Sequence, residues 1–76
     1  MKDLLIYIAQ HLVDDPDAVS VEEVVGQRTT VLQLTVADDD RGKVIGRGGR
    51  TARAIRTMMR AAGVQTGEHA MVEIVG

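Results

Sequence analysis

The sequence contains no cysteine, phenylalanine or tryptophan, and only one tyrosine and one proline among its 76 residues. Without cysteine, disulfide bonds and cysteine-ligated metal sites are excluded. The single aromatic residue excludes the stacking surfaces with which RRM and OB domains bind nucleic-acid bases. No apolar run approaches the roughly 20 residues of a membrane-spanning helix. We therefore expect a cytoplasmic protein without a membrane partner.

Catalytic and metal-binding clusters are also absent from the sequence. His11 and His69 are the only histidines, and no triad partner or metal ligand is grouped with either along the chain. We therefore predict a protein without enzymatic activity, cofactor or metal. A chain of this length buries about 60% of its unfolded surface and builds at most one small core, so we expect a single domain over residues 1–76.

Charge is distributed unevenly along the chain, although the formal net charge is only −2. Seven of the nine basic residues lie between positions 41 and 63, a segment that contains no acidic residue. The rest of the chain has two basic residues against eleven acidic ones. This segregation creates a strongly positive region and favours an anionic partner despite the negative total.

The pattern of apolar residues predicts an α+β domain in which helices cover one face of a three-stranded sheet. Residues 29–37 alternate most clearly, with Leu32, Leu34 and Val36 directed inward. The predicted element order is α-β-β-α-α-β. The helices are expected at 3–13, from the Asp38–Asp40 run to Ile45, and at 50–62, and the strands at 18–25, 29–37 and 69–75.

Local signals set the ends of these elements. Pro16 ends the first helix, and Gly26–Arg28 are expected to form the turn between the first two strands. In the run Asp38–Asp40, one carboxylate is expected to cap the second helix while the others favour its dipole. Gly63 is expected to cap the C-terminal end of the third helix.

The predicted helix 50–62 has two distinct faces at about 100° per residue. The apolar face, which we expect to pack in the core, comprises Ala52, Ile55, Met58, Met59 and Ala62. The basic face comprises Arg50, Arg53, Arg56 and Arg60. Only the N-terminal end of the basic face is close enough to reach a ligand bound at the turn before the helix.

The most informative segment is that turn with its flanking helices, which runs from Gly42 to Arg56 and reads GKVIGRGGRTARAIR. Gly46 and Gly49 allow positive φ and close approach of a ligand backbone. The N–H groups at the start of the following helix favour an anion such as phosphate. Arg47 adds a cation within the turn. The spacing does not match a P-loop or a dinucleotide-binding motif.

The segment from Val44 to Gly49 and the element order resemble K-homology (KH) domains of the prokaryotic type II, and the whole chain resembles the small bacterial KhpA family. Ala52 departs from the wider KH pattern, in which isoleucine is common there. The resemblance implies single-stranded RNA binding, with the loop clamping about four nucleotides. The residues it assigns to RNA contact are Lys43, Val44, Ile45, Gly46, Arg47, Gly48, Gly49, Arg50 and Arg53.

The resemblance also implies a homodimer, or a heterodimer with a second KH protein of the Jag (KhpB) type. It implies a role in RNA metabolism as an RNA chaperone or post-transcriptional regulator. Part of 29–37 is expected to form the wall opposite the loop. Two other hypotheses remain: a protein-interaction module for which RNA is secondary, and a helix-turn-helix DNA-binding protein. The turn Gly46–Gly49 argues against the last, because it offers no large side chain to pack two such helices.

Overall fold

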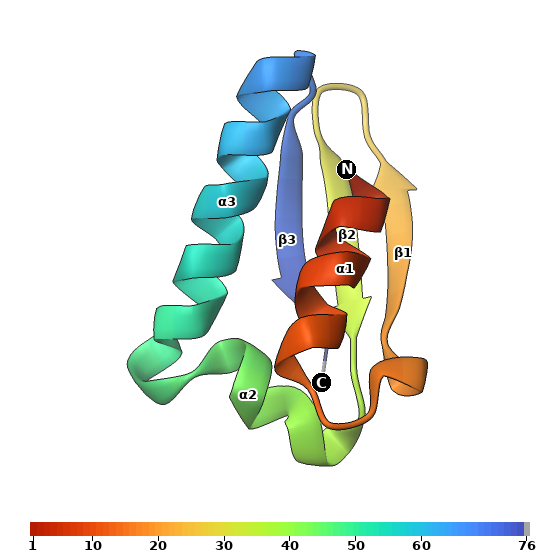
Figure 1. Cartoon of the computed structure of the whole chain (residues 1–76). Coiled ribbons are helices and arrows are strands. Elements are labelled where there is room, and N and C mark those ends of the chain that lie inside the picture. Colours follow the sequence, from red (N-terminus) through yellow and green to blue (C-terminus); the bar gives the residue numbers. More distant parts are fainter. Residues whose placement is uncertain (76) are drawn as a thin grey trace.

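The computed structural model describes residues 1–75 and shows an α+β domain with the predicted element order. Gly76, the last residue of the expected domain, lies outside the described residues. The helices are α1 (Lys2–Leu12), α2 (Arg41–Ile45) and α3 (Arg50–Thr66), and the strands are β1 (Ser20–Val25), β2 (Thr30–Thr35) and β3 (Ala70–Ile74) (Figure 1). Short 3₁₀ turns lie between them at Pro16–Ala18, Asp38–Asp40 and Arg47–Gly49.

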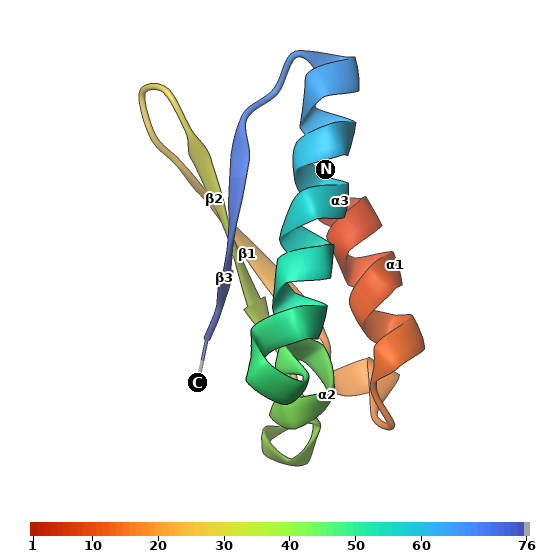
Figure 2. The same ribbon diagram turned by 90° about the vertical axis from the view of Figure 1, so that its left-hand side faces the viewer.

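The three strands form one mixed sheet in the order β1-β2-β3. β1 and β2 are antiparallel, and the predicted turn between them is confirmed, with Gly26 N–H donating to Thr29 O at 2.9 Å. β2 and β3 are parallel, and Leu32 pairs with Val72. A parallel pair requires a crossover connection, which α2 and α3 provide. All three helices lie on one side of the sheet (Figure 2).

The core lies between this face of the sheet and the helices. The predicted inward residues Leu32, Leu34 and Val36 are buried. The residues that pack against them are Leu5, Ala9, Val21, Val44, Ile55, Met59 and Val72. Each fully buried aliphatic side chain contributes about 1.5–3 kcal/mol relative to an exposed one. Since α2 and α3 both contribute to this core, it fixes the position of the loop between them.

Several expected boundaries and core positions are wrong. β1 begins at Ser20 and not at residue 18, because Pro16–Ala18 form a 3₁₀ turn. The Asp38–Asp40 run forms a separate 3₁₀ turn, which leaves α2 with only five residues. On α3, Met58 is 46% exposed, so the face that packs in the core is narrower than expected. Among residues 1–75, the structure contains no helix of the length and apolarity required to cross a membrane.

The expected cap at Gly63 is also wrong, because α3 continues to Thr66 and ends at Gly67, which has φ of 74°. Gly63 is a buried residue inside the helix. The returning chain passes close to it, and Glu68 N–H donates to Gly63 O at 2.9 Å. A Cβ at position 63 would lie 2.4 Å from Glu68 O. Gly63 therefore serves the close approach of this chain segment and not the end of the helix.

We predict that Gly63→Ala lowers the free energy of unfolding by about 1–3 kcal/mol, the usual cost of forcing extra atoms into a packed site. Alanine normally stabilises a helix interior by about 0.5–1 kcal/mol relative to glycine, so the change in the free energy of unfolding predicted here has the opposite sign. The control is Gly42→Ala in α2, where an added Cβ meets no atom within 4 Å. Chemical denaturation measures both variants, and equal stabilisation of the two would contradict the prediction.

Candidate nucleic-acid interface

The loop Gly46–Gly49 joins α2 to α3, and three of its residues have positive φ: Gly46 at 76°, Gly48 at 62° and Gly49 at 79°. Gly46 combines this φ with ψ of 171°, a backbone region that is essentially restricted to glycine. A Cβ at this position would also lie 2.3 Å from Thr51 Oγ1. Gly46 is therefore required by the turn itself, before any ligand is considered.

Arg47 and Gly48 form the exposed tip of the loop. A Cβ built on Gly48 meets nothing within 4 Å, so the backbone here is open to an approaching ligand. Gly49 is the N-cap residue of α3, and no side chain among residues 1–75 caps this helix end. The first N–H groups of a helix and its positive dipole end favour an anion. The loop and the start of α3 therefore form a surface suited to phosphate.

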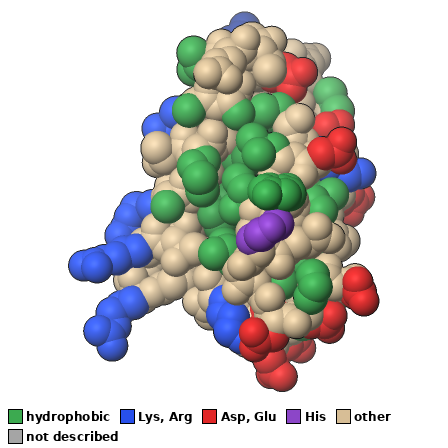
Figure 3. Space-filling model, viewed as in Figure 1, with side chains coloured by type: hydrophobic (Ala, Val, Ile, Leu, Met, Phe, Trp, Pro, Cys, Tyr) green, Lys and Arg blue, Asp and Glu red, His purple; other side chains and the backbone are tan. Residues whose placement is uncertain are grey.

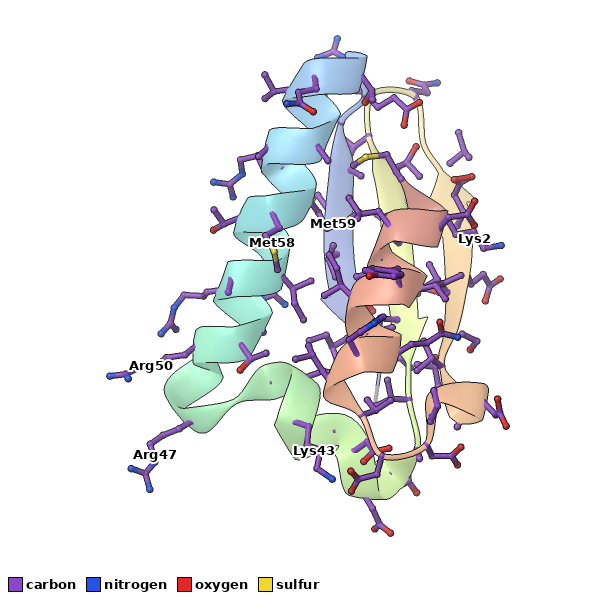
Figure 4. All side chains as sticks on the ribbon, in the orientation of Figure 1. Lys2, Lys43, Arg47, Arg50, Met58 and Met59 are labelled. Carbon is purple, nitrogen blue, oxygen red and sulfur yellow. The ribbon has the colours of Figure 1, made fainter. Side chains whose placement is uncertain are left out.

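Three arginines lie around this surface. Arg47 and Arg50 project from the loop into solvent (Figure 4). Arg53 lies one turn further along α3, and its Nη1 donates to Gly48 O at 2.9 Å. This hydrogen bond ties the loop backbone to the helix, so Arg53 braces the loop. Arg47 and Arg50 are the cations that extend toward solvent at the loop.

Lys43, which the sequence placed in the RNA-binding set, lies apart from these arginines. Its ammonium group donates to the carboxylates of Asp14 and Asp40, the latter at 3.2 Å. The hydrogen bonds to Asp14 and Asp40 raise the pKa of Lys43. In Figure 4 the Lys43 side chain points away from Arg47 and Arg50. The structure therefore does not bring Lys43 together with the loop.

Asp40 has a structural role that the sequence did not reveal. Its carboxylate is 2% exposed and accepts N–H groups from Asp14 at 3.3 Å and Asp15 at 3.1 Å. Burial alone raises the pKa of Asp40, but the N–H donors of Asp15 and Asp14 and the ammonium of Lys43 lower it below its usual range. Asp40 is the N-cap residue of α2, as predicted, but its carboxylate makes no capping hydrogen bond and instead ties α2 to the chain after α1. Among residues 1–75, no three acidic or histidine side chains are grouped to bind a metal ion.

Val44 and Ile45 were both expected to line an apolar wall beside the loop. Val44 is fully buried and packs in the core, so its side chain is not available to a ligand. Ile45, the last residue of α2, is 40% exposed. Only Ile45 therefore offers apolar surface directly before the loop.

The strand beside α3 is β3, which makes β3 a nearer candidate for the wall opposite the loop than residues 29–37. β2 is the central strand and has a partner on each edge, whereas β3 has one free edge next to α3. Arg56 Nε donates across this gap to Val72 O at 3.2 Å. The small hollow between the helix and the strand edge, about 150 Å³ in volume, is lined by Arg56, Arg60, Ala70, Met71 and Val72.

The order of the predicted elements already contains a signal that places β3 next to α3. A helical crossover between two parallel strands is almost always right-handed and packs over the strands that it connects. The order β2-α2-α3-β3 therefore places β3 beneath α3, provided that the two strands are parallel neighbours. The alternation of 69–75 by itself predicts a strand but not the strand with which it pairs.

A Gly-x-x-Gly loop between two helices that pack on one face of a mixed three-stranded sheet defines a KH domain of type II. The family described as KhpA/KhpB, KH domain matches residues 2–74. The chain belongs to this family.

Relatives named RNA-binding protein KhpA support this membership. The protein from Clostridium acetobutylicum is 52% identical over 99% of this chain and 100% of its own length. That from Clostridium perfringens is 47% identical with the same coverage, and that from Aquifex aeolicus is 43% identical over 99% of this chain and 95% of its own.

Among solved structures, a crystal structure of an Aquifex aeolicus Era variant bound to GDP and aluminium fluoride has a TM-score of 0.66. The match covers 96% of this chain and 28% of that chain, with 16% sequence identity. At this identity the similarity shows the fold alone.

Proposed function

We propose that the chain binds single-stranded RNA through the loop Gly46–Gly49 and acts in the cytoplasm as a non-enzymatic RNA chaperone or post-transcriptional regulator. The observation that carries this proposal is the exposed Gly48 backbone at the uncapped start of α3, between the solvent-directed side chains of Arg47 and Arg50. The names of the relatives, which are RNA-binding proteins, agree with an RNA ligand in place of another anion.

The proposed contacts divide into a phosphate set and a base set. The phosphates lie against the loop and the start of α3, with Arg47 and Arg50 as their cations and Arg53 bracing the loop. The bases extend over Ile45 toward the free edge of β3. We do not include Val44 and Lys43 among the proposed RNA contacts, because Val44 is buried and Lys43 is paired with carboxylates.

Salt dependence tests this proposal. With two to four phosphates contacted and about −0.7 per phosphate for a single strand, the plot of log affinity against log salt for a tetranucleotide has an expected slope between about −1.5 and −3. Fluorescence anisotropy or NMR titration measures it. A slope near −6 with duplex DNA, which seven contacts at about −0.9 each would give, would instead support the helix-turn-helix hypothesis.

We also propose that two copies of the chain associate through the groove between α1 and α3. This groove has a volume of about 470 Å³ and is lined by Tyr7, Ile8, His11, Leu12, Arg50, Thr51, Ala54, Ile55 and Met58. Figure 3 shows hydrophobic side chains gathered along this face, with most of the Lys and Arg side chains at one side and most of the Asp and Glu side chains at the other. An uncharged centre with charged margins suits a second copy of the same face.

Apart from Arg50, the groove is lined by residues outside the set proposed to contact RNA. At 100° per residue, Met58 lies about 140–160° from Arg53, Arg56 and Arg60 around α3. Arg50 lies about 80° from Met58 and lines the groove at the N-terminal end of α3. Because Gly46–Gly49 do not line the groove, a dimer built on Met58 leaves this loop accessible on both copies. Two weak clamps on one RNA then gain affinity from their effective concentration. A second KH protein of the KhpB type is the alternative occupant of this groove.

A further inference from the structure

The surface between α3 and the free edge of β3, which we call the seam, continues past Arg56 toward the C-terminal end of α3. A second hollow of about 420 Å³ lies further from the loop and is lined by Thr29, Arg60, Val64, Glu68, His69, Ala70 and Met71. Arg60, Ala70 and Met71 line this hollow and the smaller one at Arg56, so the two form a continuous path along the free edge of β3. We refer to the second hollow as the seam site.

The chemistry of the seam site matches that of a nucleotide. Val64 and Met71 are apolar but 77% and 63% exposed, so they contribute little to the core. Arg60 supplies the cation for a phosphate, and the imidazole of His69 and the hydroxyl of Thr29 are polar groups for a base edge. The Glu68 carboxylate repels phosphate and accepts from base N–H groups, which places the base toward Glu68 and the phosphate toward Arg60.

The distance along α3 between the loop and Arg60 indicates which nucleotide of a bound strand would reach the seam site. Arg60 is ten residues after Arg50, or about 15 Å at 1.5 Å per residue. Four stacked nucleotides at about 3.4 Å each cover about 14 Å, and the loop of a KH domain holds about four. The seam site is therefore reached by the nucleotide that follows those four.

On the basis of the RNA-binding function proposed above, we propose that the seam site binds an additional nucleotide of the same single strand, with its phosphate on Arg60 and its base against Val64 and Met71. The strand then lies along α3 for most of the length of the helix. This accounts for the position of Arg60 beside two exposed apolar residues on one surface.

The test compares oligouridines of four and eight nucleotides. Arg60→Ala is expected to lower the affinity for the octanucleotide about 5- to 10-fold and the affinity for the tetranucleotide less than 2-fold. It should also reduce the steepness of the salt dependence for the octanucleotide by about 0.7. Val64→Asp is expected to act in the same direction. Because both residues are exposed, the thermal transition should be unchanged. Lys2→Ala, which removes one positive charge far from the seam (Figure 4), is the control and should affect neither length.

Each outcome bears on one of the two proposals. Equal loss for both lengths would place Arg60 among the first four nucleotides and overturn the seam site. No loss for either length in Arg60→Ala and Val64→Asp would overturn it as well. If the wild-type protein bound neither oligonucleotide while remaining folded, the RNA-binding function itself would be wrong, and the seam site with it.

Discussion

Replacing Arg47 and Gly48 together by aspartate is expected to weaken the binding of a single-stranded tetranucleotide at least about 100-fold. The change removes one cation and places two carboxylates where the phosphates are proposed to lie. Hydrogen bonds to charged groups contribute about 1.5–3 kcal/mol each, and about 1.4 kcal/mol corresponds to a tenfold change in affinity. The loss of the Arg47 contact alone accounts for a factor of about 10 to 100, and the repulsion between the two new carboxylates and the phosphates supplies the rest.

The double variant should remain folded. Arg47 and Gly48 are exposed, and a Cβ on Gly48 meets nothing within 4 Å. Gly48 has φ of 62° and ψ of 19°, close to the left-handed region that aspartate adopts more readily than most residues. The hydrogen bond from Arg53 goes to the carbonyl oxygen of Gly48 and does not depend on its side chain.

A matched control uses the same two substitutions at the other end of the molecule. Arg28 is exposed in the β1–β2 turn, and Gly67 has φ of 74° with nothing within 4 Å of an added Cβ. Arg28→Asp with Gly67→Asp makes the same change in net charge and in backbone strain. We expect the affinity for the tetranucleotide, measured by the same titration, to change less than threefold. Unchanged binding in the loop variant, with an intact thermal transition, would show that the loop is not the clamp.

The parts of the fold that were predicted correctly depend on local patterns. Alternation in 29–37 is a period-two signal that only a half-buried strand produces, and Leu32 and Leu34 are fully buried. The glycine-rich turn was equally clear, because Gly46 occupies a backbone region that only glycine tolerates. Both features are encoded within a few consecutive residues.

The errors concern contacts between residues distant in the sequence. Asp40 accepts N–H groups from Asp14 and Asp15, which are 26 and 25 positions earlier, and no local rule predicts this pairing. Gly63 was mistaken for a cap because the approach of Glu68 O depends on how the chain returns to β3. Val44 and Ile45 look alike in sequence, but the packing of α2 buries the first and exposes the second.

The distinction between local sequence signals and contacts with distant residues also applies to the candidate site. Arg47 and Arg50 were identified from their positions at the loop, and both extend into solvent. Lys43 is close to the loop in sequence, but the acidic groups of Asp14 and Asp40 bind its ammonium group on the other side of α2. Proximity in sequence to the motif therefore does not by itself predict that a side chain faces the loop, because acidic partners elsewhere in the fold hold Lys43 away from it.

Met58→Asp is expected to convert a dimer into a folded monomer. Met58 is 46% exposed and lies within the α1–α3 groove, so the isolated domain tolerates a charge there. In a symmetric dimer each substitution occurs twice, and the desolvation of each carboxylate costs several kcal/mol. The dissociation constant of the dimer should therefore rise at least about 100-fold. Ala61→Asp, on the exposed side of α3 next to this face, is expected to act in the same direction.

Light scattering at tens of micromolar measures the association, with Val25→Asp as the control, because Val25 is a 73% exposed valine of β1 outside the groove. The Met58 variant should bind a tetranucleotide within about threefold of the wild-type affinity, since Gly46–Gly49 do not line the groove and Met58 is about two turns of α3 away from Arg50. Its affinity for an RNA long enough to span two loops should fall further, because the second clamp is lost. A wild-type protein that is monomeric under these conditions, or a Met58 variant that remains dimeric, would exclude this groove as the interface. Equal losses of affinity for short and long RNA would instead show that Met58 supports the loop within one chain.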